Sequence, residues 1–179
     1  MKLIFIFLTI WSLFNSNKIS CDPELKPTLE TIQQLSGANE LIEKVLQDGP
    51  LAMKRTDHFP FKAYWDAATR TIGVKPAENP FFSLLFELHN AAAQKEFEAY
   101  DRMASQKKIS KADYITAVEW IEYQNTFKTA ELVEEGIRLG IFPPNSQTYY
   151  SSTFEEHLND QRRTGHSAWI GGIYDDLAS

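Results

Sequence analysis

Two long helical segments constrain the fold of this chain more than any other feature. The first runs from Phe81 to about Ala104, and the second opens at Ser110 and continues to about Leu139. Asp113 stands three residues after Ser110, an arrangement that resembles a capping box at the start of a helix. Apolar residues recur at helical spacing in both segments, which predicts one buried face on each helix. We therefore expect the two helices to pack together.

The stretch before the first long helix has the pattern of a small β-sheet. Residues 50–57 fit a first strand. Residues 63–65 and 70–74 fit a hairpin, because two short runs with β-branched and aromatic residues flank a turn at Asp66–Thr69. The loop that follows contains two prolines, which favour the start of a helix just after it.

Further helices are expected on both sides of this region. Residues 27–49 indicate one or two helices, and residues 152–163 indicate one more. A length of 179 residues suggests one domain. The order of helix, strands, helix, helix and tail predicts a single α+β domain, residues 21–179, with a small antiparallel sheet packed with long helices. The aromatic-rich end of the tail is expected to pack back on this domain.

The N-terminal segment has the pattern of an export signal. Lys2 is followed by an apolar run that extends with small interruptions to Phe14, and this run is too short to span a bilayer as a mature helix. Residues 1–20 are therefore predicted to be a signal peptide. A buried N-terminal helix and an uncleaved anchor are the alternatives. The predicted location is exported: periplasmic, envelope-anchored or secreted.

Cys21, the only cysteine, stands at the end of this segment and cannot form an internal disulfide. Its position suggests lipidation after cleavage of the signal. Ser20 fits such a signal, whereas Lys18 replaces the aliphatic residue that such signals share. Ordinary cleavage nearby is the alternative. Contact with a membrane is expected only through the signal or a lipid anchor.

Composition excludes several function classes. The chain has 18 basic and 24 acidic residues and a net charge of −6. This charge argues against non-specific nucleic-acid binding, which requires positive charge to displace counterions. The sequence contains no phosphate-binding P-loop and no glycine-rich dinucleotide turn, so no cofactor is predicted.

The two long helices carry a repeated polar pattern on their apolar faces. The segments "ELHN" and "EYQN" each place an asparagine three residues after a glutamate: Asn90 after Glu87, and Asn125 after Glu122. Buried polar groups need hydrogen-bond partners, and each amide supplies two donors. We expect a polar network between the helices, in which Glu119 is a further candidate member. In the alternative, the glutamates point to solvent and the asparagines lie at the edge of the core.

The segment "FELHNAAA" resembles the active-site helix of the zincin metallopeptidases. In their motif H-E-x-x-H, two histidines bind zinc and the glutamate is the general base. The alignment puts Phe86 and Asn90 at the two ligand positions, keeps Glu87 as the base, and puts His89 at a spacer. The downstream segment "EWIEYQN" is similar to the helix that supplies a glutamate ligand in one zincin group. The resemblance implies a degenerate zincin-like core that spans Tyr64 to about Asn125.

No metal site is predicted from the sequence, because a phenyl ring and a carboxamide stand where the imidazoles should be. His89 projects away from that face, and the other three histidines, His58, His157 and His166, do not stand at helical metal spacing. Whether the segments "FEEHLND" and "TGH" converge in space cannot be read from the sequence. The incomplete motif argues against peptidase activity.

These patterns predict an exported binding or interaction module, such as a secreted bacterial factor, whose partner is another protein. The alternative is a metal-independent hydrolase that uses Glu87 with His89 or with a carboxylate partner. A third interpretation is a lipid-anchored envelope protein with a structural role. An enzyme requires a concave pocket in which Glu87 is reachable, whereas a structural pair is sealed.

Overall fold

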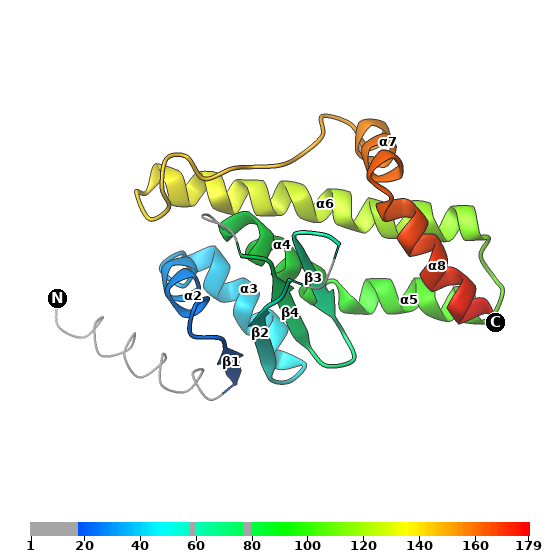
Figure 1. Ribbon diagram of the computed structural model, residues 1–179, viewed down its shortest axis with the longest axis horizontal. Helices are drawn as coiled ribbons and strands as arrows, with labels where there is room; N and C mark the ends of the chain where they lie inside the picture. The colour runs from blue at the N-terminus through cyan, green and yellow to red at the C-terminus, as the bar shows by residue number, and fades with distance from the viewer. Residues whose placement is uncertain (1–17, 58–59, 77–79) are drawn as a thin grey trace.

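The computed structural model describes residues 18–57, 60–76 and 80–179. It confirms an α+β fold in which helices pack against a small sheet (Figure 1). The elements in chain order are β1 (Ile19–Cys21), α2 (Lys26–Ile32), α3 (Ser36–Gln47), β2 (Leu51–Arg55), β3 (Ala63–Asp66), β4 (Thr71–Val74), α4 (Phe81–Ala92), α5 (Gln94–Ser105), α6 (Lys111–Arg138), α7 (Phe154–Thr164) and α8 (His166–Ala178).

The sheet has the strand order β1-β2-β4-β3 and is mixed rather than antiparallel. The predicted hairpin is present, since β3 and β4 pair antiparallel with Trp65 opposite Ile72. The pairs β1–β2 and β2–β4 are parallel. The strand β4 lies between β2 and β3 in the interior of the sheet, and all four of its residues are buried. Pairing between strands distant in sequence depends on tertiary packing, so the local pattern did not reveal its direction.

The predicted helix from Phe81 to Ala104 is wrong as a continuous element, because it breaks at Ala93 into α4 and α5. The Ala93 amide donates to the carbonyl oxygens of both His89 and Asn90, which tightens the last turn of α4. Neither proline nor glycine stands at the break, so the sequence does not mark it. The second long helix is confirmed as α6, and its cap is the predicted one: Ser110 Oγ accepts from the Asp113 amide at 3.1 Å.

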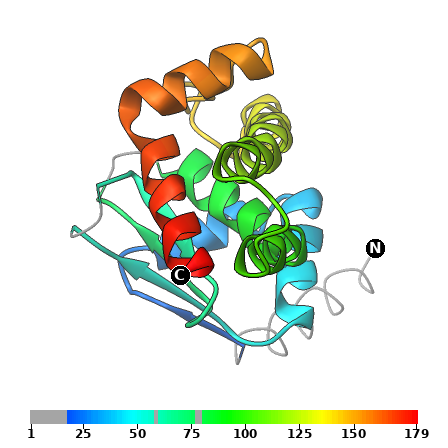
Figure 2. The same ribbon diagram turned by 90° about the vertical axis from the view of Figure 1, so that its right-hand side faces the viewer.

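The helix α4 is the central element of the packing. It contacts α3 and the strands β3 and β4, and it also contacts α6, which crosses the molecule along its longest dimension (Figures 1 and 2). The apolar residues Leu84, Leu85 and Leu88 are fully buried in this core. The contact between α4 and α6 confirms that the two long segments pack together.

The C-terminal tail contains two helices rather than one. The predicted helix over residues 152–163 is α7, with Thr153 as its N-cap. Gly165 then adopts φ +88°, a left-handed conformation that glycine tolerates, and α8 begins at His166. The helix α8 packs against both α5 and α6 (Figure 2), which confirms that the aromatic-rich end folds back on the domain.

The expected signal peptide lies mainly outside the described residues, because the description begins at residue 18. Its last expected residues, Ile19 and Ser20, belong to β1 together with Cys21. The Cys21 thiol is half-buried, and burial raises its pKa to about 11. Among the helices of the described residues, none combines the length and apolar character needed to cross a membrane.

Candidate functional site

A cavity of about 460 Å³ lies between the edge strand β3, the helices α4 and α5, and the helices α6 and α8. Most of its lining is aromatic or apolar, with side chains such as Phe86, Phe97 and Trp169. Glu87, Glu122 and His166 also line it, and they come from three different helices. Glu87 is only 5% exposed, yet it faces this cavity rather than a sealed helix interface. The arrangement therefore meets the geometric requirement stated above for an enzyme or a binding pocket.

The structure brings three of the predicted network residues together between α4 and α6. The Asn90 amide donates to Glu87 Oε2 at 3.1 Å, and the Asn125 amide donates to Asn90 Oδ1 at 3.0 Å. Lys128 Nζ donates to Asn125 Oδ1 at 3.2 Å and completes the chain. Asn125 thus contacts Asn90 and not Glu87, so the two amides bridge the helices. The alternative in which the asparagines lie at the edge of the core is wrong, because Asn90 and Asn125 are both buried.

Glu87 is held in an environment that disfavours its charge. Its pKa is raised to about 8, mainly by burial and in part by the nearby Glu122 carboxylate, although the hydrogen bond from Asn90 opposes the shift. At neutral pH the Glu87 carboxyl therefore retains its proton and is able to donate it.

Glu119 lies in a second polar group, between α6 and the C-terminal helices. It is fully buried and accepts a hydrogen bond from Ser167 Oγ at 2.7 Å. His157 Nε2 lies 3.2 Å from one carboxylate oxygen, and His166 Nδ1 lies 3.3 Å from the other. Burial opposes ionisation of Glu119, but these hydrogen bonds outweigh it and hold its pKa at about 2. Glu119 is therefore a carboxylate at neutral pH.

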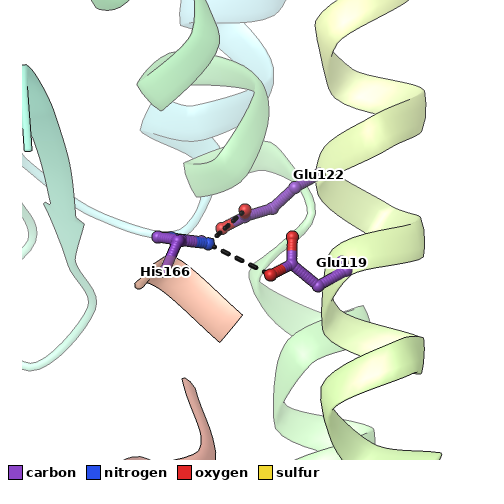
Figure 3. A group of neighbouring side chains, drawn as sticks. All are labelled: Glu119, Glu122 and His166. Atoms are coloured by element: carbon purple, nitrogen blue, oxygen red, sulfur yellow. Dashed lines mark hydrogen bonds and ion pairs between the residues drawn. The ribbon is translucent and has the colours of Figure 1, made fainter. Parts of the chain in front are cut away.

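Glu122 belongs to the Glu119 group and not to the asparagine network. Its Oε2 lies 3.6 Å from His166 Nδ1, and Figure 3 shows the side chains of Glu119, Glu122 and His166 pointing toward one another. Burial raises the pKa of Glu122 to about 7. Burial alone would lower the pKa of His166, but Glu122 and Glu119 outweigh it and raise that pKa to about 9.

Sequence reasoning missed that three residues of α7 and α8 meet at Glu119 of α6. They are His157, His166 and Ser167. They lie 38, 47 and 48 residues after Glu119 in the chain. The two histidine-containing segments were the only signal, and only the turn at Gly165 brings the start of α8 to α6.

His89 does not join either group, so the structure does not pair it with Glu87. It is not among the residues that line the cavity, and its buried Nε2 has no hydrogen-bond partner in the described part of the chain. Burial and, to a smaller extent, the charges of Lys128 and Lys44 lower the pKa of His89 to about 4.

The residues at the zincin ligand positions do not fit zinc. Phe86 offers no ligand atom, and the Asn90 side chain is engaged with Glu87 and Asn125 through its nitrogen and oxygen. We derive no zinc chemistry at these positions.

The chain matches no model of a protein family, no curated protein and no solved structure. The function must therefore be argued from the cavity and its side chains.

Proposed function

We infer that this protein is an exported binding module whose cavity accepts an extended segment of a partner protein. The observation that carries this proposal is the position of β3, an edge strand in the described sheet that also lines the cavity. An exposed strand edge is a common site for an added peptide strand, and adjoining pockets then select alternate side chains.

The backbone register of β3 supports this mode of binding. The Lys75 amide donates to the Lys62 carbonyl oxygen at 2.8 Å, and Ala63 stands opposite Val74. Bonded and non-bonded pairs alternate along an antiparallel ladder. The N–H and C=O groups of Ala63 and Trp65 therefore point away from β4, toward the open edge.

The side chains around the cavity indicate what such a segment carries. Aromatic walls favour apolar or aromatic side chains, whereas the carboxyl groups of Glu87 and Glu122 favour hydrogen-bond donors. The net charge of −6 also favours a basic partner over a nucleic acid. The segment "FELHN" resembles the helix of a family that binds peptides, and this resemblance supports a peptide as the ligand of the cavity. The helix lacks the two histidines that bind the metal in that family.

Selection of peptides from a displayed library on the purified protein, followed by affinity measurements, tests the proposal. Ala63→Pro removes an outward N–H from the strand edge, and Tyr149→Ala removes part of the cavity wall. Each is expected to weaken a selected peptide by about tenfold or more. Tyr150→Ala is the matched control, because Tyr150 is exposed and does not line the cavity. Equal binding by all four proteins, or no selected peptide, would refute the proposal.

Export is a separate part of the proposal and rests on Lys2 and the apolar run that ends at Phe14. The intact mass of the protein from its native host is expected to show the loss of about 20 residues. Full-length protein retained in the cytosol would contradict export, whatever the outcome of the peptide measurements.

A second candidate function is hydrolysis with Glu87 as the general acid. The observation that favours it is a pKa of about 8 for a carboxyl group that faces a cavity. A screen of peptide, ester and glycoside substrates is expected to find an activity that Glu87→Gln abolishes and Glu134→Gln retains. Glu134 is exposed on α6, away from the cavity lining, so it controls for the loss of a carboxylate. An activity that survives Glu87→Gln would exclude this role.

A further inference from the structure

We propose that Glu119, Glu122 and His166 form a binding site for one divalent transition-metal cation in the wall of the cavity. One ligand atom from each residue is available, and the three atoms lie within 4.8 Å of one another. The site is distinct from the "FELHN" segment, which we still expect not to bind zinc. It does not depend on the proposed peptide binding.

The three ligand atoms lie close to the spacing that a shared cation requires. His166 Nδ1 lies 3.3 Å from Glu119 Oε1 and 3.6 Å from Glu122 Oε2. The second separation is too long for a hydrogen bond. Ligands that bind one cation at about 2.0–2.2 Å stand about 3.0–3.5 Å apart. The His166–Glu119 separation already matches this spacing, and all three atoms lie within 4.8 Å of one another, so a closure of at most roughly 1.3 Å would bring the set to it.

Glu122 is largely, though not fully, shielded from solvent and makes little polar contact. Its side chain is 13% exposed, and within the described residues its one polar contact is the 3.6 Å approach to His166. Buried carboxylates are normally paired or bound to metals. Glu122 points toward His166 and Glu119 (Figure 3), so a cation between the three side chains would satisfy it.

The surrounding residues already orient two of the three ligands. Ser167 Oγ donates to Glu119 Oε1 at 2.7 Å, and His157 lies 3.2 Å from Glu119 Oε2. The His166 ring meets Phe61 edge-on, with the ring centroids 4.9 Å apart. Outer contacts of this kind fix ligand orientation in metal sites.

The ligand set indicates the class of cation. Two carboxylates balance the charge of a divalent ion, and an imidazole nitrogen favours Zn²⁺, Mn²⁺ or Fe²⁺ over Mg²⁺ and Ca²⁺, which prefer oxygen. Glu122 and His166 line the cavity whereas Glu119 lies behind them, so the remaining coordination positions face the cavity. A ligand in the cavity would then be able to reach the cation.

The test is metal titration of the purified full chain after removal of metal with a chelator, with Zn²⁺, Mn²⁺ and Mg²⁺ as probes. We expect one Zn²⁺ or Mn²⁺ per chain, a raised melting temperature and weaker binding of Mg²⁺. Glu122→Gln and His166→Asn are each expected to weaken Zn²⁺ binding at least about tenfold. Asp101→Asn is the matched control, because Asp101 is a carboxylate in the same cavity lining but outside the cluster.

NMR of the histidine rings makes the test independent of how well the variants fold. Addition of Co²⁺ to the wild-type chain is expected to shift or broaden the His166 ring signals strongly and the His89 ring signals much less, because His89 belongs to neither the cluster nor the cavity lining. The proposal is refuted if no probe binds at one per chain, if the His166 ring is unaffected, or if the variants bind Zn²⁺ as tightly as Asp101→Asn. If Asp101→Asn alone lost Zn²⁺ binding, the cation would lie elsewhere in the cavity, and the proposed site would be refuted.

Discussion

The helix α6 contributes to two buried polar groups that are built in different ways. Toward α4, Asn125 joins Asn90 and Glu87 through amide hydrogen bonds. Toward α7 and α8, Glu119 is surrounded by His157, His166 and Ser167. We call these the amide network and the Glu119 cluster. In the amide network Glu87 retains its proton at neutral pH, whereas in the Glu119 cluster Glu119 is ionised. Amide hydrogen bonds join two helices, while an ionised cluster with histidines is also able to exchange a proton or a cation.

The largest effect is expected from Glu119→Gln, which removes the buried charge from the Glu119 cluster. Glutamine offers a single neutral acceptor oxygen in place of two charged ones, so one of the two histidines loses its acceptor and both lose the negative charge beside them. Removal of one partner from a buried charged pair costs about 3–5 kcal/mol. Urea unfolding in the presence of chelator measures the loss in the free energy of unfolding. Glu134→Gln, an exposed carboxylate on the same helix, is the control and is expected to change it by less than about 0.5 kcal/mol. Equal effects of the two substitutions would show that the cluster does not stabilise the fold.

His89→Leu tests a histidine that lies outside both polar groups and has a buried ring nitrogen without a partner in the described chain. The pKa of His89 is about 4 in the folded chain, below its ordinary value of 6.5. The unfolded chain therefore takes up this proton first as the pH falls, and the wild type loses stability through this window. The loss reaches at most about 1.4 kcal/mol per pH unit. His89→Leu is expected to be more stable than the wild type, by a margin that grows from about pH 6.5 down to about pH 4.

Chemical denaturation at several pH values measures this margin. At neutral pH the variant should already gain about 1 kcal/mol, because it removes a buried nitrogen without a partner in the described chain. Parallel curves for the two proteins would mean that His89 is solvated in solution and that its environment on α4 does not disfavour the charged form.

Asn90→Leu tests the amide network directly and is expected to lower the free energy of unfolding by about 1–3 kcal/mol. It removes the donor to Glu87 and the acceptor from Asn125. Asn90→Leu combined with Asn125→Leu should cost less than the sum of the two single substitutions, because the stranded amide is removed as well. Full additivity in this double-mutant cycle would show that the two asparagines do not interact in solution.

The difference between the two polar groups also explains how far the sequence predicts this molecule. The amide network lies on two neighbouring helices, so the repeat of glutamate and asparagine at helical spacing was sufficient to place Asn90 and Asn125 on facing surfaces. The hairpin and the Ser110 cap were predictable for the same reason, because the residues that indicate each of them lie within a few positions of one another in the chain.

The remaining features depend on contacts between distant segments. The parallel pairing of β2 with β4 has no local signature, and the break at Ala93 occurs in a run without proline or glycine. The Glu119 cluster requires α7 and α8 to cross α6, and their position depends on packing around Gly165. Histidines that are far apart in the sequence therefore lie close together in the fold. The spacing of residues within one helix does not predict such a contact.

The smallest effect is expected from Ser110→Ala, which removes the N-cap of the helix that both groups share. Loss of the hydrogen bond from the Asp113 amide to Ser110 Oγ should cost about 1 kcal/mol. Ser110 precedes Glu119 by nine residues, or roughly 13 Å along the helix, so neither polar group should change. The loss is therefore expected to add to that of Glu119→Gln within about 0.5 kcal/mol in urea unfolding. A larger coupling would mean that the start of α6 and the Glu119 cluster unfold as one unit, and the histidines would then stabilise the helix itself rather than only its contacts with α7 and α8.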